Sequence, residues 1–161
     1  MKRLFFILLF FGCLCFLSCQ RDYALLDYQN GNLVARCRVN EKYTVEIDKT
    51  ESGCTLTVLE PKNASGITFT VGERVFVSYD GTEIEMEKGD LGGICALAGI
   101  FYQNKDSLVS ATQKGEGSEL TFQSDGCVYQ ITLGKGSLPK TVYVASQSFR
   151  YEVEILSIEL K

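Results

Sequence analysis

Alternation of apolar and polar residues with a period of two dominates the chain after residue 31. It is clearest in NLVARCRVN at 32–40, KYTVEID at 42–48 and CTLTVLE at 54–60. Successive side chains of a β-strand point to opposite faces of a sheet, so each of these stretches presents one apolar face and one polar face. The pattern predicts strands that bury one face.

The same alternation continues through most of the chain. It recurs in GITFTV, RVFVSY and EIEME, and later in ELTFQ, CVYQITL, TVYVAS and FRYEVEILSIELK. Asp80-Gly81 and Asp125-Gly126 are strong signals for hairpin turns. In the last stretch the apolar positions change phase between Ile155 and Leu156, which predicts a bulge or a sharp bend. We expect about ten strands joined by short turns.

One segment has helical spacing instead. Its apolar residues recur at three- and four-residue intervals, at Leu91, Ile94, Cys95, Ala98, Phe101 and Tyr102. This stripe predicts a helix over 91–102, with Asp90 as its N-cap. Strands and helix together predict a mainly β (α+β) fold, in which a strongly curved, mostly antiparallel half-barrel sheet holds one helix in its concave face.

The first residues have the layout of a bacterial export signal. Lys2 and Arg3 precede a run of 14 residues, at 4–17, that carries no charge. A helix that crosses a membrane needs about 20 apolar residues, so a permanent span is the weaker interpretation. The stretch FLSC at 16–19 resembles the lipobox of bacterial lipoproteins. A plain signal peptide or an uncleaved N-terminal anchor is the alternative.

The lipobox resemblance implies that Cys19 receives a diacylglycerol on its sulfur and becomes the new N-terminus. The chain then divides into a signal peptide at 1–18, a lipidated tether at 19–32 and a single half-barrel domain at 33–161. The resemblance implies an extracytoplasmic protein that its lipid anchors to the cell membrane. The net charge of −4 argues against nucleic acid as a partner.

The order of the predicted elements carries a second resemblance. The stretch GITFTVGERVFVSYDGTEIEM at 66–86, followed by a helical insert, looks like the LolA and LolB class of half-barrel lipoprotein carriers, and so does the closing stretch LPKTVYVASQSFRYEVEILSIEL at 138–160. Those carriers hold acyl chains in the hollow of the sheet, so the resemblance implies an apolar ligand. The residues expected to line its cavity are Phe69, Val77, Ile94, Ala98, Phe101, Tyr102 and Tyr129.

Small residues along the predicted helix leave two interpretations open. Gly92, Gly93, Ala96, Ala98 and Gly99 can thin the helix and leave space beneath it for a ligand. The same residues can instead allow the helix to pack closely on the sheet, because a small domain has little core volume to spare.

Composition argues against catalysis. The chain contains no histidine, which excludes Ser-His-Asp and Cys-His catalytic sets and histidine-ligated metals. We therefore expect no catalytic residue, no metal and no cofactor. Three function classes remain: a module that binds an apolar ligand such as a lipid or acyl chain, a non-catalytic adaptor that holds another envelope protein on a sheet face or edge, and last, for lack of a catalytic set, an enzyme.

Four cysteines, Cys37, Cys54, Cys95 and Cys127, follow the predicted tether, and all four fall in the apolar phase of their elements. Their spacings contain no CxxC motif of the redox or zinc-binding kind. We favour four thiols that pack as small apolar groups. Export to an oxidising compartment favours disulfides, and a Cys37–Cys54 bridge is the alternative that the sequence leaves open.

Overall fold

The structure is a computed structural model that describes residues 27–114, 117–134 and 137–161. Its eleven strands form one sheet. The strands are β1 (Leu33–Val39), β2 (Tyr43–Lys49), β3 (Cys54–Glu60), β4 (Thr68–Val71), β5 (Val75–Tyr79), β6 (Thr82–Met86), β7 (Leu108–Lys114), β8 (Gly117–Ser124), β9 (Cys127–Leu133), β10 (Pro139–Ala145) and β11 (Arg150–Leu160). The helical elements are α2 (Asp27–Asn30), α3 (Gly92–Gly99) and two 3-10 turns, η1 (Ile100–Tyr102) and η2 (Lys105–Ser107).

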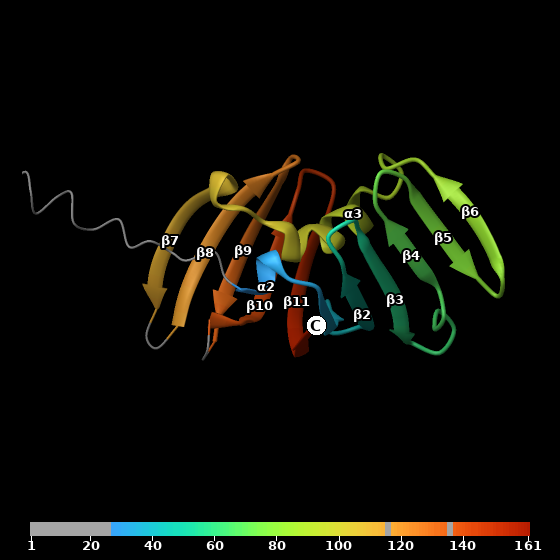
Figure 1. The fold of residues 1–161 in the computed structure, drawn as a ribbon, viewed down its shortest axis with the longest axis horizontal. Coiled ribbons are helices and arrows are strands. Elements are labelled where there is room, and N and C mark those ends of the chain that lie inside the picture. The colour runs from blue at the N-terminus through green and yellow to red at the C-terminus, as the bar shows by residue number, and fades with distance from the viewer. Residues whose placement is uncertain (1–26, 115–116, 135–136) are drawn as a thin grey trace, which may run out of the picture.

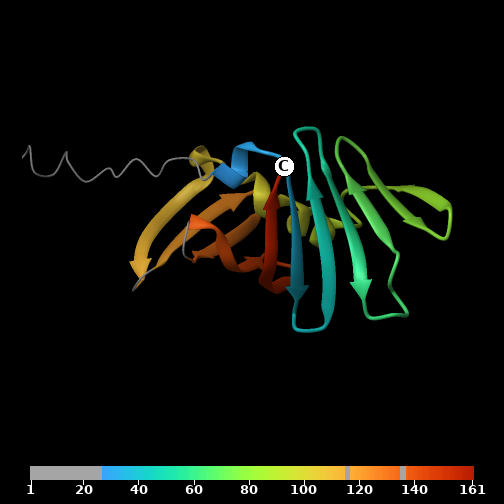
Figure 2. The same cartoon turned by 60° about the horizontal axis from the view of Figure 1, so that its bottom comes forward.

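The strand order is β6-β5-β4-β3-β2-β1-β11-β10-β9-β8-β7. Every neighbouring pair is antiparallel. The first and last strands therefore meet in the middle of the sheet, while β6 and β7 form its two edges. Between these edges the chain crosses the hollow of the curved sheet through α3, η1 and η2 (Figures 1 and 2). This confirms the predicted half-barrel with a helix inserted after the sixth strand.

We expected about ten strands, and the described residues form eleven. The additional strand is β7, whose sequence lacks the alternation of apolar and polar residues. Its apolar residues, Leu108, Val109 and Ala111, do not alternate. The reason is a bulge: the register of β7 against β8 shifts between Leu108 and Ser110, which leaves Val109 without an opposite residue. A bulge places two residues opposite one and breaks the period of two.

The predicted turns and the predicted bulge are confirmed. Asp80 and Gly81 have positive φ angles of 50° and 76° between β5 and β6, as the tight hairpin turn favoured by Asp-Gly requires. Asp125-Gly126 makes the same kind of turn between β8 and β9. In β11 the register against β1 skips Leu156, because Arg36 lies opposite Ser157 and Cys37 opposite Ile155.

The helix differs from its prediction at both ends. It begins at Gly92, Leu91 occupies the N-cap position, and no side chain caps it, so the assignment of Asp90 as N-cap was wrong. It ends at Gly99 and continues as the tighter turn η1. The buried face also differs from the predicted stripe, since Leu97 of α3 and Ile100 of η1 are buried while Tyr102 is exposed.

The core lies between the concave face of the sheet and the helical elements. It combines inward-facing side chains of strands on both sides of β1 and β11 with Tyr28 of α2, Leu97 of α3 and Phe101 of η1. The four cysteines of the domain are free thiols, and Cys37, Cys54 and Cys127 are buried in this core, as favoured from the sequence. Cys95 differs from that expectation, because it is only half-buried. Among the described residues, no helix is both long and apolar enough to cross a membrane.

A buried lysine fastens the N-terminal helix α2 to the sheet. Lys49 is only 3% exposed, and its Nζ donates to the backbone carbonyls of Gln29 (3.1 Å) and Gly31 (2.7 Å). These bonds satisfy a charge that would otherwise be costly to bury. The packed part of the chain therefore starts before residue 33, where β1 begins.

Buried thiols should make the fold sensitive to alkali. Burial raises the pKa of Cys37 and of Cys54 to about 12, from an ordinary value of 9.0. Above pH 9 the unfolded chain releases these protons while the folded chain keeps them, so the free energy of unfolding should fall from about pH 9 to pH 12. Each thiol contributes up to about 1.4 kcal/mol per pH unit. Lys49, whose pKa burial lowers, acts in the opposite direction.

Urea denaturation across this pH range, in the presence of a reductant, measures the effect. The double variant Cys37→Ala/Cys54→Ala should show a shallower decline, because two of the titrating groups are gone. An identical slope in the wild type and the double variant would contradict the assignment to these thiols.

Candidate functional site

A hollow of about 270 Å³ lies between α3 and the neighbouring strands. Cys95, Ala98 and Gly99 of α3 and Tyr102 of η1 line its helical side. Its sheet side comes from the β2–β3 turn, the start of β3 and the end of β4, where Cys54 and Val71 are opposite each other in the register. The hollow therefore joins three separate parts of the chain.

Two glycines of α3 allow the helix to approach the sheet closely. A Cβ atom on Gly93 would lie 2.3 Å from the Tyr151 hydroxyl, and one on Gly99 would lie 2.8 Å from the Tyr129 hydroxyl. Both distances are shorter than a Cβ contact tolerates. Close packing thus explains these two glycines, and the hollow lies beside this contact.

An apolar row leads from the core to an uncovered part of the concave face. In the register, Leu56, Phe69, Val77 and Ile84 are opposite one another across β3, β4, β5 and β6. Leu56 is buried, Phe69 and Val77 are half-buried, and Ile84 is 57% exposed. In Figures 1 and 2 the strands β5 and β6 extend beyond the helices. We call β4, β5 and β6 the wing.

The predicted cavity residues occupy three different environments. Ala98 and Tyr102 line the hollow. Phe69 and Val77 lie on the wing, outside the hollow. Ile94 is half-buried against the core, while Phe101 and Tyr129 are fully packed inside it. The structure thus brings two of the expected cavity residues together with Cys54, Cys95 and Val71, which the sequence analysis did not assign to the cavity.

The side chains around the hollow are almost all uncharged. Burial raises the pKa of Cys54 to about 12 and also raises that of Cys95, so both thiols stay protonated at neutral pH. Tyr102 is partly buried, and the desolvation raises its pKa to about 12. Its hydroxyl lies within hydrogen-bonding distance of the backbone carbonyls of Thr50 and Gly53, which share its single proton. Of the described lining residues, only Glu51 carries a charge. Protonated thiols are poor nucleophiles, so neither Cys54 nor Cys95 is activated for nucleophilic attack at neutral pH.

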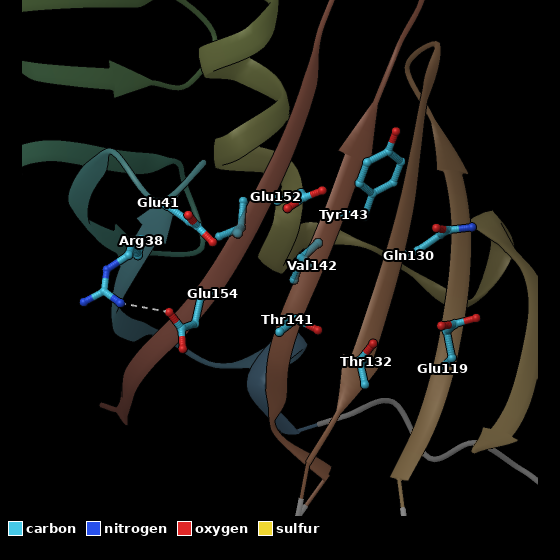
Figure 3. Close-up of a pocket in the computed structure, with 11 residues that line it drawn as sticks. Arg38, Glu41, Glu119, Gln130, Thr132, Thr141, Val142, Tyr143, Glu152 and Glu154 are labelled. Carbon is cyan, nitrogen blue, oxygen red and sulfur yellow. Dashed lines mark hydrogen bonds and ion pairs between the residues drawn. The ribbon is translucent and has the colours of Figure 1, made fainter. Parts of the chain in front are cut away.

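A second, larger hollow of about 560 Å³ lies on the opposite face of the sheet. Figure 3 shows its lining on β1, β8, β9, β10 and β11, where Glu152 and Glu154 flank the buried Val153. Arg38 forms an ion pair of 3.1 Å with Glu154. Carboxylates, hydroxyls and amides dominate this lining, so it does not match an apolar ligand.

Comparison with known proteins finds similarity in structure only. No protein-family model matches the chain, and no curated protein matches it. A solved structure of an uncharacterized conserved protein from Thermus thermophilus is 10% identical and has a TM-score of 0.49, over 84% of this chain and 83% of that one. A LolA superfamily protein from Nitrosomonas europaea is 10% identical with a TM-score of 0.39, over 81% and 84%. Scores this low do not inform function.

Proposed function

We propose that this protein is a lipid-anchored extracytoplasmic module that binds an apolar ligand, such as an acyl chain, on the concave face of its sheet. The observation that carries the proposal is the apolar row that runs from Leu56 to the exposed Ile84. Monomeric proteins rarely leave a contiguous apolar surface open without a binding role. The anchor rests on the lipobox-like stretch at 16–19, which lies outside the described residues.

The geometry favours a ligand that is long and thin. The hollow beneath α3, at about 270 Å³, is smaller than the roughly 300–1,000 Å³ of typical ligand pockets. A chain that enters it near Val71 must therefore continue over the wing, along Val77 and Ile84. Each methylene that the wing shields from water contributes about 0.8 kcal/mol.

A fluorescent fatty acid titrated against the purified protein tests this function. Saturable binding is expected, and Ile84→Asp should weaken it about tenfold, because a carboxylate on the wing opposes the burial of an apolar chain. The matched control is Val109→Asp, which makes a similar change on the exposed edge strand β7. Binding should survive in this control.

Two results would contradict the proposal. One is the absence of saturable binding, and the other is an equal loss of affinity in the Ile84 and Val109 variants. Native mass spectrometry of protein purified from bacteria gives an independent measure, because a carrier is expected to retain a lipid. Protein that carries no lipid and binds no fatty acid would leave the adaptor function as the better account.

A further inference from the structure

The two edges of the sheet differ in charge. β6 and β7 end the strand order, and Figures 1 and 2 show them at opposite ends of the molecule. Within the described residues, each has a paired strand on one side only. An end strand presents backbone N–H and C=O groups to any strand that approaches, and natural proteins protect such edges with charges, prolines or bulges.

Charge protects β6 against pairing with a second copy of itself. If two copies met antiparallel about Ile84, Glu83 of each would lie opposite Glu85 of the other. Like charges that are directly opposite destabilise a strand pair. On their own chain these carboxylates interact with β5 and the turn before it, since Ser78 donates to Glu83 (3.1 Å) and Arg74 pairs with Glu85 (3.3 Å).

β7 has a bulge at Val109, but neither charge nor proline protects the part of the strand from Ser110 to Gln113. Its sequence LVSATQK contains no proline and no charge before the last residue. If two copies met antiparallel about Ala111, Ser110 of each would lie opposite Thr112 of the other. Both residues are exposed, and hydroxyl side chains that are opposite each other are a favourable pair. Facing side chains therefore oppose self-pairing at β6 and favour it at β7.

Val109 adds an apolar contribution at the same edge. It is the bulged residue of β7, and its side chain is 63% exposed, the largest fraction among the exposed large apolar residues of the described chain. Pairing along β7 would cover part of this surface. The bulge limits the regular ladder to Ser110 and the residues after it, so the pairing is expected to be short.

We propose that β7 is a self-association interface, at which two copies of this chain pair antiparallel about a two-fold axis at Ala111. A two-fold interface uses the same patch on both copies and closes on itself. Because β6 repels its own copy, association stops at the dimer. The proposal goes beyond ligand binding and does not depend on it.

Disulfide trapping in the full-length chain tests the register. Ala111→Cys places two thiols directly opposite each other across the two-fold axis, and mild oxidation should yield a disulfide-linked dimer on a non-reducing gel. Ile84→Cys, exposed at the centre of the other edge, is the matched control and should stay monomeric. Equal cross-linking of both variants, or of neither, would overturn the proposal.

A charge exchange supplies a second test that does not rely on cysteine. In Ser110→Lys/Thr112→Lys, two pairs of lysines face each other across the axis, and the association constant from analytical ultracentrifugation should fall about tenfold. In Ser110→Glu/Thr112→Lys the facing charges are opposite, so association should persist or strengthen. Identical behaviour of the two variants would refute the register. A wild-type chain that is monomeric at every concentration tested would refute the interface.

Discussion

Replacing Phe101 with aspartate should abolish the cooperative thermal unfolding of the domain. Phe101 is completely buried, at 0% exposure, and its ring meets that of Tyr28 edge-on with centroids 6.2 Å apart. Loss of a buried phenyl ring costs about 3–5 kcal/mol, and an unpaired buried charge adds several more. The two costs together are comparable to the whole free energy of unfolding of a typical domain, roughly 5–15 kcal/mol.

Circular dichroism during heating measures this effect. The matched control is Tyr79→Asp, which introduces the same charge at an aromatic residue of the wing that is 55% exposed, and its transition should remain near that of the wild type. Phe101→Leu, which keeps most of the apolar volume, should unfold cooperatively at a reduced temperature. A Phe101→Asp protein that melts like the wild type would show that η1 does not pack in the core.

Changing Cys19 to serine should eliminate incorporation of radioactive palmitate. Lipoprotein anchoring needs the cysteine sulfur to form a thioether with diacylglycerol, and a serine hydroxyl at this position does not replace it. The variant should leave the membrane fraction or accumulate as the unprocessed chain. Loss of the acyl chains has a large effect because each buried methylene contributes about 0.8 kcal/mol to membrane binding.

Cys13→Ser and Cys15→Ser are the controls for this experiment, since both cysteines precede the stretch that resembles the lipobox. Both variants should keep their label. Persistent labelling of Cys19→Ser would refute the lipid anchor at Cys19 and leave a plain signal peptide or an uncleaved anchor.

A lipid on Cys19 would also limit how far the domain lies from the membrane. Tyr28 is already buried in the domain, and nine extended residues reach about 30 Å, so the fold would lie within about 30 Å of the lipidated cysteine.

The apolar alternation and turn signals were sufficient to predict all but one of the eleven strands. They succeed because a half-buried strand needs an apolar residue at every second position, and this requirement is local. The bulge at Leu156 was predictable for the same reason, as a change of phase within one strand. β7 was missed because its own bulge, at Val109, interrupts the alternation of apolar and polar residues on which the prediction rests.

The candidate site was only partly predictable. Ala98 and Tyr102 could be placed near the hollow because both belong to the helical apolar stripe. Cys54 and Val71 come from different strands, and only the register brings them together beneath α3. Lys49 falls at an inward-facing position of β2, two residues after the buried Ile47. The carbonyls that accept its hydrogen bonds belong to Gln29 and Gly31, near α2, so its environment could not be predicted from the β2 sequence alone.

The sequence by itself determined the local features of this protein: the strands with their buried faces, the two Asp-Gly turns, the phase change in β11 and the existence of a helix after β6. The tertiary structure decided the central position of β1 and β11, the end of α3 at Gly99 and the extent of the sheet that the helices leave uncovered. The first follows from the pairing of β1 with β11, which come from opposite ends of the domain. The other two depend on how helix and sheet pack, here on the close approach of Gly93 to Tyr151 and of Gly99 to Tyr129. Such contacts join residues far apart in the chain, so no periodicity within a single stretch records them.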